Sequence, residues 1–514
     1  MHLLMSMSAT KKEIPGILLL AGQKTFGRNK SNVPIYKFIP NNTELNPLLV
    51  PYKMKTMGFS KVFSNLFVLV LPNANDSLGK YGTLTNVIGQ VDDLASFYDY
   101  QIICKNLNIS LSNLTKAIIQ QKITPNLFSN LSNKEDWMQK YSIQDKLNKA
   151  VVWTIDPPGC ADFDDAYSIS YDIETSASTL TIYIANVPII LDSFSLWDKL
   201  SERVATIYLP ASKRPMLPTI LSEGLCSLKA GTERVAFAME FSISKDSDIP
   251  TFIRHYNCLV NVRRNFIYEE PDLLLNADYQ RLKSIISKPN DGSFDSHDVV
   301  AKMMIWMNAQ SAQLLIEKTQ GILRTVVKTE NNNESTDLSP MAQQIHHWKC
   351  MHGEYVLIND GATYRHSALE LDAYAHITSP IRRLVDVINM SLLCIENLEA
   401  KSIYSVWSGK MDELNIRMKG IQKVQNTCTL LEKITTSPEL LSQTLEGFVF
   451  DKTMVYIPTL KITSKFTSEK TETDEVVVVV DDNVDDLEKN KKLFKIFLFS
   501  DEHNIPKKIR IMQV

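Results

Sequence analysis

The stretch Thr154-Ile-Asp-Pro-Pro-Gly-Cys-Ala-Asp-Phe-Asp-Asp-Ala-Tyr-Ser168 decides the fold prediction for this chain. Apolar runs rich in β-branched and aromatic residues flank it at 151–155 and 180–185, and both are typical of β-strands. Two prolines and Gly159 force a loop directly after the first strand. The stretch therefore predicts buried strands joined by a loop that carries four carboxylates, namely Asp156, Asp162, Asp164 and Asp165.

Four anions beside buried strands are costly, because burial and mutual repulsion raise their pKa values. A divalent cation removes that cost, and carboxylate oxygens suit Mg²⁺ or Mn²⁺. A calcium loop of the EF-hand type starting at Asp162 would need Gly at its sixth position and Glu at its twelfth, where the chain has Tyr167 and Ile173. From these residues alone, a metal site and a solvated acidic loop remain equally good interpretations.

Composition limits the classes of protein that fit. A length of 514 residues suggests about three or four domains. Because the net charge is −3, any attraction for nucleic acid must come from a local channel rather than the whole surface. The seven cysteines form no C-x-x-C pair, which favours a reducing compartment. We expect no signal peptide and no membrane span, and therefore an intracellular, cytoplasmic protein.

The chain changes character along its length. We expect five segments: a disordered lead at 1–13, a small β-barrel at 14–95, a helical connector at 96–150, an α+β domain at 151–435, and a second small barrel at 440–514. Helical spacing is expected at 107–123 and 132–150 in the connector, and later at 299–317, 386–398 and 414–434. Strands of the last barrel are expected at 447–450, 454–458, 476–480 and 493–499.

Two smaller groups of residues have competing interpretations. In the first barrel, three lysines lie close to three aromatic residues, which could form a stacking and phosphate surface or merely a basic solvated rim. These residues are Tyr52, Lys53, Lys55, Phe59, Lys61 and Phe63. His346, His347, Cys350 and His352 could suggest a transition-metal site, but one polar helix face explains them better because a second ligand pair is missing.

The second informative stretch is Tyr374-Ala-His-Ile-Thr-Ser-Pro-Ile-Arg-Arg-Leu-Val-Asp386. Thr378 and Ser379 before Pro380 suit a helix N-terminus, which offers free N–H groups to an anion. Two arginines follow at once, and Asp386 could hold one of them in place. A phosphate-binding turn and a plain capped helix with surface arginines are equally consistent with this pattern.

Together the two stretches identify the chain as similar to the ribonuclease II (RNB) exoribonucleases, a family that includes the catalytic subunit of the eukaryotic exosome. The run I-D-x5-D-x-D-D-A at 155–166 and the run Y-x-H-x-T-S-P-I-R-R at 374–383 carry the resemblance. Shorter matches follow in the family's order: Tyr208-Leu-Pro210, Pro215-Met-Leu-Pro218, Leu221-Ser222, Cys226-Ser-Leu228, Arg234, Asn308 and Gly321-Ile-Leu-Arg324. The resemblance implies an α+β catalytic RNB domain between an OB or cold-shock-like N-terminal barrel and an S1-like C-terminal barrel.

The resemblance also implies an activity, which is hydrolysis of single-stranded RNA from its 3′ end into nucleoside 5′-monophosphates. It makes Asp156, Asp162, Asp164 and Asp165 ligands of two Mg²⁺ ions, for which Mn²⁺ could substitute, with Asp164 and Asp165 also catalytic. Arg382 would contact the scissile phosphate. Tyr208, Tyr268, Ser379 and Arg383 would complete the RNA-binding set, with Tyr208 stacking on bases and Tyr268 near the sugar. We expect a monomer with single-stranded RNA as its partner and no membrane.

Several positions depart from the family pattern. Tyr183 and Asn186 replace a His and an Asp, Leu384 replaces an aromatic residue, and Met390 replaces a His. Ala301 stands where relatives often carry a Glu that helps to recognise the ribose, which puts the choice of RNA over DNA in question. No aromatic partner for a base clamp is evident between Tyr268 and Asn308, and no activating glutamate is evident around Ile421.

These departures keep two further hypotheses open. One is an RNA-binding subunit of the RNB fold with weak or no hydrolysis. The other is a structural aspartate-rich domain without a nucleic-acid partner, which the two matched motifs argue against.

Overall fold

The computed structural model of the protein describes residues 12–514 apart from 54–62, 74–78, 131–132, 148, 172–177, 245–249, 288–293, 327–352, 360–363, 396–397, 452–453, 461, 469–490 and 500–507. Several expectations fall outside these described residues. They are the lead at 1–11, the side chains of Lys55, Phe59 and Lys61, the group His346, His347, Cys350 and His352, and the strand expected at 476–480.

The N-terminal unit is a five-stranded sheet, as the alternating apolar runs predict. It contains β1 (Ile14–Leu18), β2 (Ile35–Pro40), β3 (Leu48–Pro51), β4 (Leu66–Pro72) and β5 (Gly82–Gln90), in the spatial order β3-β2-β1-β4-β5. A parallel bridge between Leu49 and Tyr81 connects the two ends of this order, and the Leu49 amide donates to the Lys80 carbonyl at 2.7 Å. Phe38, Val50 and Val68 are fully buried inside. The sheet therefore curls into a barrel of the oligonucleotide-binding type.

The C-terminal unit repeats this strand order in a closed barrel. Its strands are β16 (Thr444–Asp451), β17 (Met454–Ile457), β18 (Ile462–Ser468), β19 (Lys491–Phe499) and β20 (Lys508–Gln513), ordered β16-β17-β18-β20-β19. β18 and β20 pair in parallel. The parallel bridge between Leu49 of β3 and Tyr81, which precedes β5, is the corresponding pairing in the first barrel. The sequence predicted β16, β17 and β19, but not β18 and β20.

In sequence, the α+β domain follows the first barrel and precedes the second, and its sheet positions the candidate site. The strands β6 (Ile143–Asp145), β7 (Val152–Asp156), β8 (Asp165–Tyr171), β9 (Ser178–Ala185), β12 (Glu233–Ile243) and β13 (Thr251–Ile267) follow the order β12-β9-β8-β7-β13-β6. β12 also pairs with β13, so the sheet curves back on itself. Two short strands, β10 (Ile207–Leu209) and β11 (Ser212–Arg214), form a separate hairpin, and β14 (Ile322–Thr325) pairs with β15 (Glu354–Leu357).

Helices cover this sheet and connect it to the barrels. The longer ones are α1 (Leu94–Cys104), α2 (Ser112–Gln120), α6 (Ala277–Ile286), α7 (Ser296–Glu317), α9 (Leu384–Cys394), α10 (Leu398–Ser408) and α11 (Met411–Thr436). The shorter ones are α3 (Lys134–Lys140), α4 (Val187–Ser193), α5 (Pro271–Leu274), the 3₁₀ helices η1 (Ala21–Gln23), η2 (Leu127–Asn130), η3 (Trp197–Lys199), η5 (Ser367–Leu369), η6 (Pro438–Leu441) and η7 (Pro458–Leu460), and the π-helix η4 (Ile220–Leu225).

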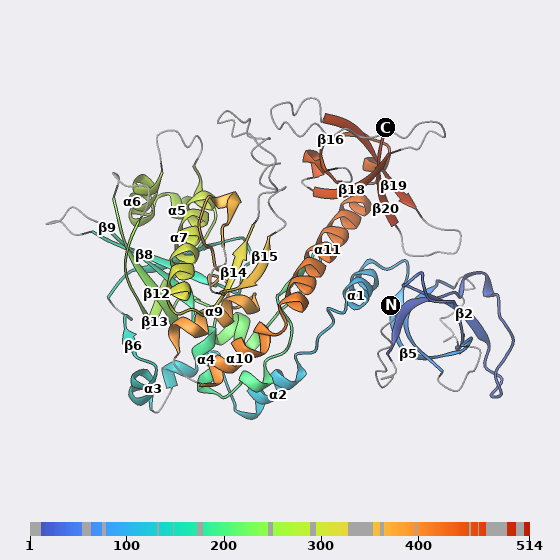
Figure 1. The fold of residues 1–514 in the computed structure, drawn as a ribbon, viewed down its shortest axis with the longest axis horizontal. Helices are drawn as coiled ribbons and strands as arrows, with labels where there is room; N and C mark the ends of the chain where they lie inside the picture. The colour runs from blue at the N-terminus through green and yellow to red at the C-terminus, as the bar shows by residue number, and fades with distance from the viewer. Residues whose placement is uncertain are drawn as a thin grey trace.

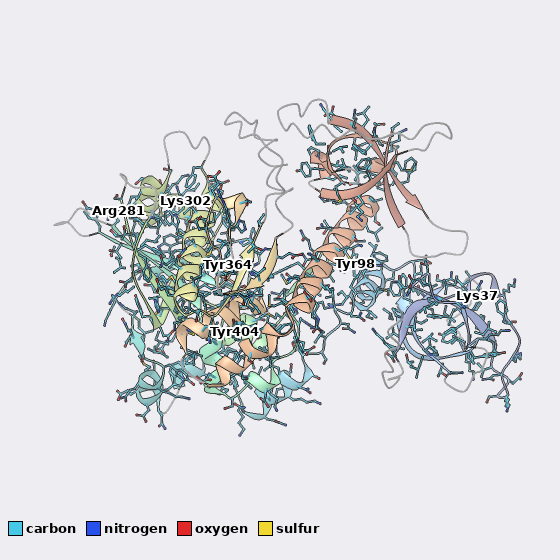
Figure 2. All side chains as sticks on the ribbon, viewed as in Figure 1. Lys37, Tyr98, Arg281, Lys302, Tyr364 and Tyr404 are labelled. Carbon is cyan, nitrogen blue, oxygen red and sulfur yellow. The ribbon has the colours of Figure 1, made fainter. Side chains whose placement is uncertain are left out.

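One helix joins the large domain to the last barrel. Figure 1 shows α11 running from the α+β domain to the β16–β20 barrel, with α1 beside it. Tyr98 of α1 is buried, and burial raises its pKa to about 12 with a further contribution from Glu432 of α11 (Figure 2). The N-terminal barrel is thus tied through α1 to the same helix that carries the C-terminal barrel.

Two element predictions needed correction. The helix expected over 132–150 ends at Lys140, because the next residues form β6 and pair with β13. The helix expected over 386–398 ends at Cys394, because Ile395 is extended and a new helix begins at Leu398. No helix in the described part of the chain is long and apolar enough to cross a membrane.

Candidate active site

Two antiparallel strands bring three of the four aspartates to one edge of the sheet. β7 ends at Asp156 and β8 begins at Asp165, with Trp153 directly opposite Tyr167. Extending that register places Asp156 opposite Asp164. In the loop between the strands, Gly159 has a φ of 77°, which is costly for residues with a Cβ.

Burial gives these carboxyl groups unusual protonation behaviour. Asp156 and Asp164 are 9% and 4% exposed. Burial, together with the charge of the neighbouring Asp165, raises the pKa of Asp156 to about 8. Burial also raises the pKa of Asp164 to about 7, although Arg382 acts in the opposite direction. The pKa of Asp165 is raised by burial, while a hydrogen bond from the Tyr167 hydroxyl opposes the shift.

Asp164 joins the two informative stretches of sequence. Its Oδ1 accepts a hydrogen bond from the Ile381 amide at 2.9 Å, and its Oδ2 accepts one from Arg382 Nε at 3.1 Å. Asp164 and Ile381 are 217 residues apart in sequence. The fold therefore places the turn at residues 380–382, called the arginine turn here, directly over the loop at residues 157–164 that carries the aspartates.

The arginine turn differs from the predicted helix start. Residues 380–382 form a turn, and α9 begins only at Leu384. The amide of Ser379 donates to Asp386 Oδ1 at 2.7 Å, so this N–H is engaged within the protein, like that of Ile381. Asp386 also pairs with Arg383 at 3.0 Å, as expected. Arg382 thus faces the aspartates, while Ser379 and Arg383 belong to the support beneath the turn.

The two predicted aromatic residues lie near the same aspartates. β7 and β13 are parallel and end together at Asp156 and Ile267, so Tyr268 follows directly beside Asp156, and its amide donates to the Asp156 carbonyl at 3.1 Å. Burial raises the pKa of Tyr268, and Asp165 and Asp156 add to the shift. Its ring stacks on His297, with 3.7 Å between the ring centroids.

Tyr208 reaches the site from the β10–β11 hairpin. The hairpin is fixed to the arginine turn by a bridge between Ala205 and Arg383 and by a hydrogen bond from the Thr206 amide to the Arg382 carbonyl at 2.9 Å. The Tyr208 side chain is 43% exposed, as a stacking platform must be. Partial burial raises its pKa to about 12, while Arg382 lowers it.

Asp162, the fourth aspartate, has a different environment. Its Oδ1 accepts a hydrogen bond from Lys213 Nζ at 2.9 Å, and Lys213 also pairs with Glu223 at 2.8 Å. The buried Ser227 fixes the loop on either side of Asp162, because its hydroxyl donates to the Ala161 carbonyl at 2.8 Å and accepts from the Phe163 amide at 3.0 Å.

A scan against protein-family models matches the RNB domain to residues 144–288 and 279–394. Residues 144–394 therefore form an RNB domain. The matched region contains both informative stretches and every predicted site residue. The flanking barrels lie outside it.

Several known proteins match more of the chain than the RNB domain alone. Ribonuclease R of Chlamydia trachomatis is 25% identical over 368 residues, which cover 57% of this chain and 50% of that protein. The chain spans 50–63% of the length of the curated relatives that it matches over more than 350 residues. Two solved structures share the fold. Mycoplasma genitalium RNase R in complex with ribose-methylated single-stranded RNA has a TM-score of 0.65 at 15% identity over 98% of this chain and 90% of that chain. Yeast Ssd1, described as a pseudonuclease, has a TM-score of 0.60 at 15% identity over 89% of this chain and 65% of that chain.

The metal implied by the RNB resemblance fits part of the predicted ligand set. Asp156 Oδ2 is buried and has no hydrogen-bond partner, so it is available as a ligand. Among the acidic groups, Asp165 has the largest effect on the pKa of Asp156. Asp162 and Asp164 are instead paired with Lys213 and Arg382. Among the described residues, no three His, Cys, Asp or Glu side chains are grouped closely enough to hold a metal ion. The carboxylates suit Mg²⁺ chemically, but the structure does not assemble all four around one point.

Four of the five substituted positions that depart from the RNB pattern are buried in the core. Asn186 caps α4 by accepting from the Ile189 amide at 3.1 Å, and the buried Tyr183 hydroxyl lies 3.0 Å from Ser168 Oγ. Leu384 and Met390 are fully buried among apolar side chains. Ala301 is exposed on α7. These substitutions are compatible with the fold and leave Asp164 and Arg382 in contact.

Sequence reasoning assigned no role to four supporting residues. Lys213 and Ser227 act on residues 51 and 64 positions away, a separation at which no local pattern is visible. Asn308 was noted only as part of the resemblance, yet it holds the second stretch to α7: its side chain donates to the Tyr374 hydroxyl and to Thr378 Oγ1, at 3.0 and 3.2 Å, and accepts from the Ile377 amide at 2.9 Å. His297 carried no signal at all.

Proposed function

We propose that the chain is a metal-dependent hydrolytic exoribonuclease that degrades single-stranded RNA from the 3′ end to nucleoside 5′-monophosphates. The observation that carries the proposal is the contact of buried Asp164 with Arg382 and the Ile381 amide. This contact joins a carboxylate cluster, which attracts cations, to a guanidinium group, which attracts phosphate.

In this proposal each side chain has a separate task. Arg382 keeps 43% of its side chain exposed while its Nε holds Asp164, so its other nitrogens are available to offset charge on the scissile phosphate. Tyr208 stacks on a base and Tyr268 lines the sugar pocket. Ser379 and Arg383 contribute by holding the turn on Asp386. Mg²⁺ bound near Asp156 and Asp165 would activate water and stabilise the leaving oxygen.

A second candidate function is RNA binding with weak or no hydrolysis. Two observations favour it: Asp162 and Asp164 are engaged by Lys213 and Arg382, and the fold is shared with yeast Ssd1, a pseudonuclease. Against it stands the buried and unpartnered Asp156 Oδ2, which is costly to retain without a ligand.

Replacing Asp164 by Asn separates these candidates. With Mg²⁺ and a 5′-labelled single-stranded RNA, we expect Asp164→Asn to lower the cleavage rate at least ~100-fold, an effect of the size usual for one transition-state contact, and to leave RNA affinity within about threefold. The matched control is Asp198→Asn, because Asp198 is 66% exposed and paired only with its neighbour Lys199. Loss of RNA binding together with cleavage would show that Asp164 is structural. Absence of cleavage by the wild type at equal affinity would favour the binding protein.

A further inference from the structure

Lys213 is an ammonium group built into the carboxylate cluster. Its Nζ lies 2.9 Å from Asp162 Oδ1 and 2.8 Å from Glu223 Oε1. The Asp162 side chain is 11% exposed, and those of Lys213 and Glu223 are each 30% exposed. The three groups come from β11, from the loop after β7 and from η4, so the pairing connects three separate elements.

The position of Lys213 also connects the cluster to the stacking residue. Lys213 lies directly opposite Tyr208 in the β10–β11 register. Side chains directly opposite each other lie on the same face of an antiparallel pair. The other strand is held by α11, because Gln425 Oε1 accepts a hydrogen bond from the Tyr208 amide at 3.0 Å. The hairpin is therefore fixed at one side by α11 and at the other by an ion pair to a predicted metal ligand.

An ammonium group and a divalent cation compete for the same carboxylate. Each is attracted to the Asp162 carboxylate, and the two positive charges repel each other at short range. Glu223 shares the ammonium group, so it weakens the hold of Lys213 on Asp162. Removing the positive or the negative partner should therefore change cation binding in opposite directions.

We propose that Lys213 is the internal counter-ion of Asp162, which restrains divalent-cation binding at the aspartate cluster and positions the Tyr208 hairpin, and that Glu223 sets the strength of this restraint. This inference rests on the proposed function only in assuming that the cluster binds a divalent cation. Lys213 is a positioning residue here, since it touches Asp162 and not the reacting phosphate.

The test is direct binding of Mn²⁺ to the full chain, with free Mn²⁺ measured by electron paramagnetic resonance and no RNA present. We expect Lys213→Gln to lower the Mn²⁺ Kd about three- to fivefold, the effect of a partly exposed ion pair, and Glu223→Gln to raise it by a similar factor. Lys213→Arg, which keeps the charge, should restore a Kd close to that of the wild type. The matched control is Lys134→Gln, which breaks the remote Lys134–Glu233 pair at comparable exposure and should leave the Kd unchanged.

Opposite shifts exclude a general loss of structure, which would weaken binding in both variants. Unchanged or equally weakened Mn²⁺ binding in Lys213→Gln and Glu223→Gln would overturn the inference and leave the proposed function standing if the wild type still cleaves RNA. A wild type that binds no Mn²⁺ would overturn both this inference and the metal dependence of the proposed function.

Discussion

At the scale of single residues, Asp156 has the least satisfied side chain in the site. Its Oδ2 is buried without a hydrogen-bond partner, and burial together with Asp165 raises its pKa to about 8. An unfolded aspartate has a pKa of ~4. Between these two values the folded chain keeps a proton that the unfolded chain releases, so stability is lost as pH rises through this window.

This linkage predicts a pH-dependent effect of Asp156→Asn. In EDTA at pH 8.5 the variant should be more stable than the wild type by on the order of 2 kcal/mol, because the amide removes the cost of a buried charge. Near pH 4 the two proteins should be equally stable. Thermal unfolding followed by circular dichroism at both pH values measures the difference. A variant that is destabilised at pH 8.5 would contradict the raised pKa.

Single residues were also where sequence analysis was most and least informative. The aspartates and Arg382 were found because charges crowded near apolar runs or prolines stand out locally. Lys213 lies in an ordinary hairpin, and only the fold shows that it pairs with Asp162. Ser379 and Arg383, which the resemblance assigns to RNA binding, both contact Asp386 on the first turn of α9.

At the scale of elements, α7 holds the second stretch against the sheet through Asn308. This buried side chain forms hydrogen bonds with Tyr374, Ile377 and Thr378. Removing it leaves several buried polar groups without a partner, and each such group costs about 1–3 kcal/mol.

We therefore expect Asn308→Ala to reduce the free energy of unfolding by about 2–4 kcal/mol and to lower cleavage, since Arg382 follows this segment. Urea unfolding measures the loss of stability. Asn426→Ala is the control, because Asn426 is exposed on α11 and should change stability by less than about 0.5 kcal/mol. Equal effects of the two substitutions would show that Asn308 does not hold the segment.

Elements were predictable where their own periodicity is strong. β7, β9, α7 and α11 follow from their apolar spacing. β6 was missed because it is short and exists through pairing with β13. The start of α9 was placed too early because the amides of Ser379 and Ile381 bind Asp386 and Asp164 instead of opening a helix. Both errors come from contacts between distant parts of the chain.

At the scale of the whole molecule, two barrels with the same strand order accompany the α+β domain in a chain of low net charge. The total of −3 gives no general attraction for RNA. Binding must then depend on local cations such as Arg382. If a single strand contacts about five phosphate-binding groups, the logarithm of the binding constant should fall with the logarithm of salt concentration with a slope of about −3 to −4.

Filter binding of a single-stranded RNA in EDTA, between low and high salt, measures this slope. EDTA prevents cleavage during the measurement under the proposed metal dependence. Arg382→Gln should reduce the slope by about 0.7, the value for one phosphate contact. A slope near zero would mean that stacking alone holds the strand.

The architecture itself was the most predictable feature of the molecule. Alternating apolar runs at both ends and the two central stretches predicted barrels around an α+β domain, and the structure has that order. The connection of the N-terminal barrel to α11 was not visible in the sequence, because it depends on packing of α1 against that helix.

Cleavage of a 5′-labelled single-stranded RNA by the wild-type chain, with Mg²⁺ or with EDTA, tests the central claim most directly. A matching DNA strand runs beside it. We predict a ladder that shortens from the 3′ end only with Mg²⁺, and a DNA strand that also shortens would show that the sugar is not selected. RNA that is bound but stays intact with Mg²⁺ would contradict the enzyme and leave an RNA-binding protein of the RNB fold.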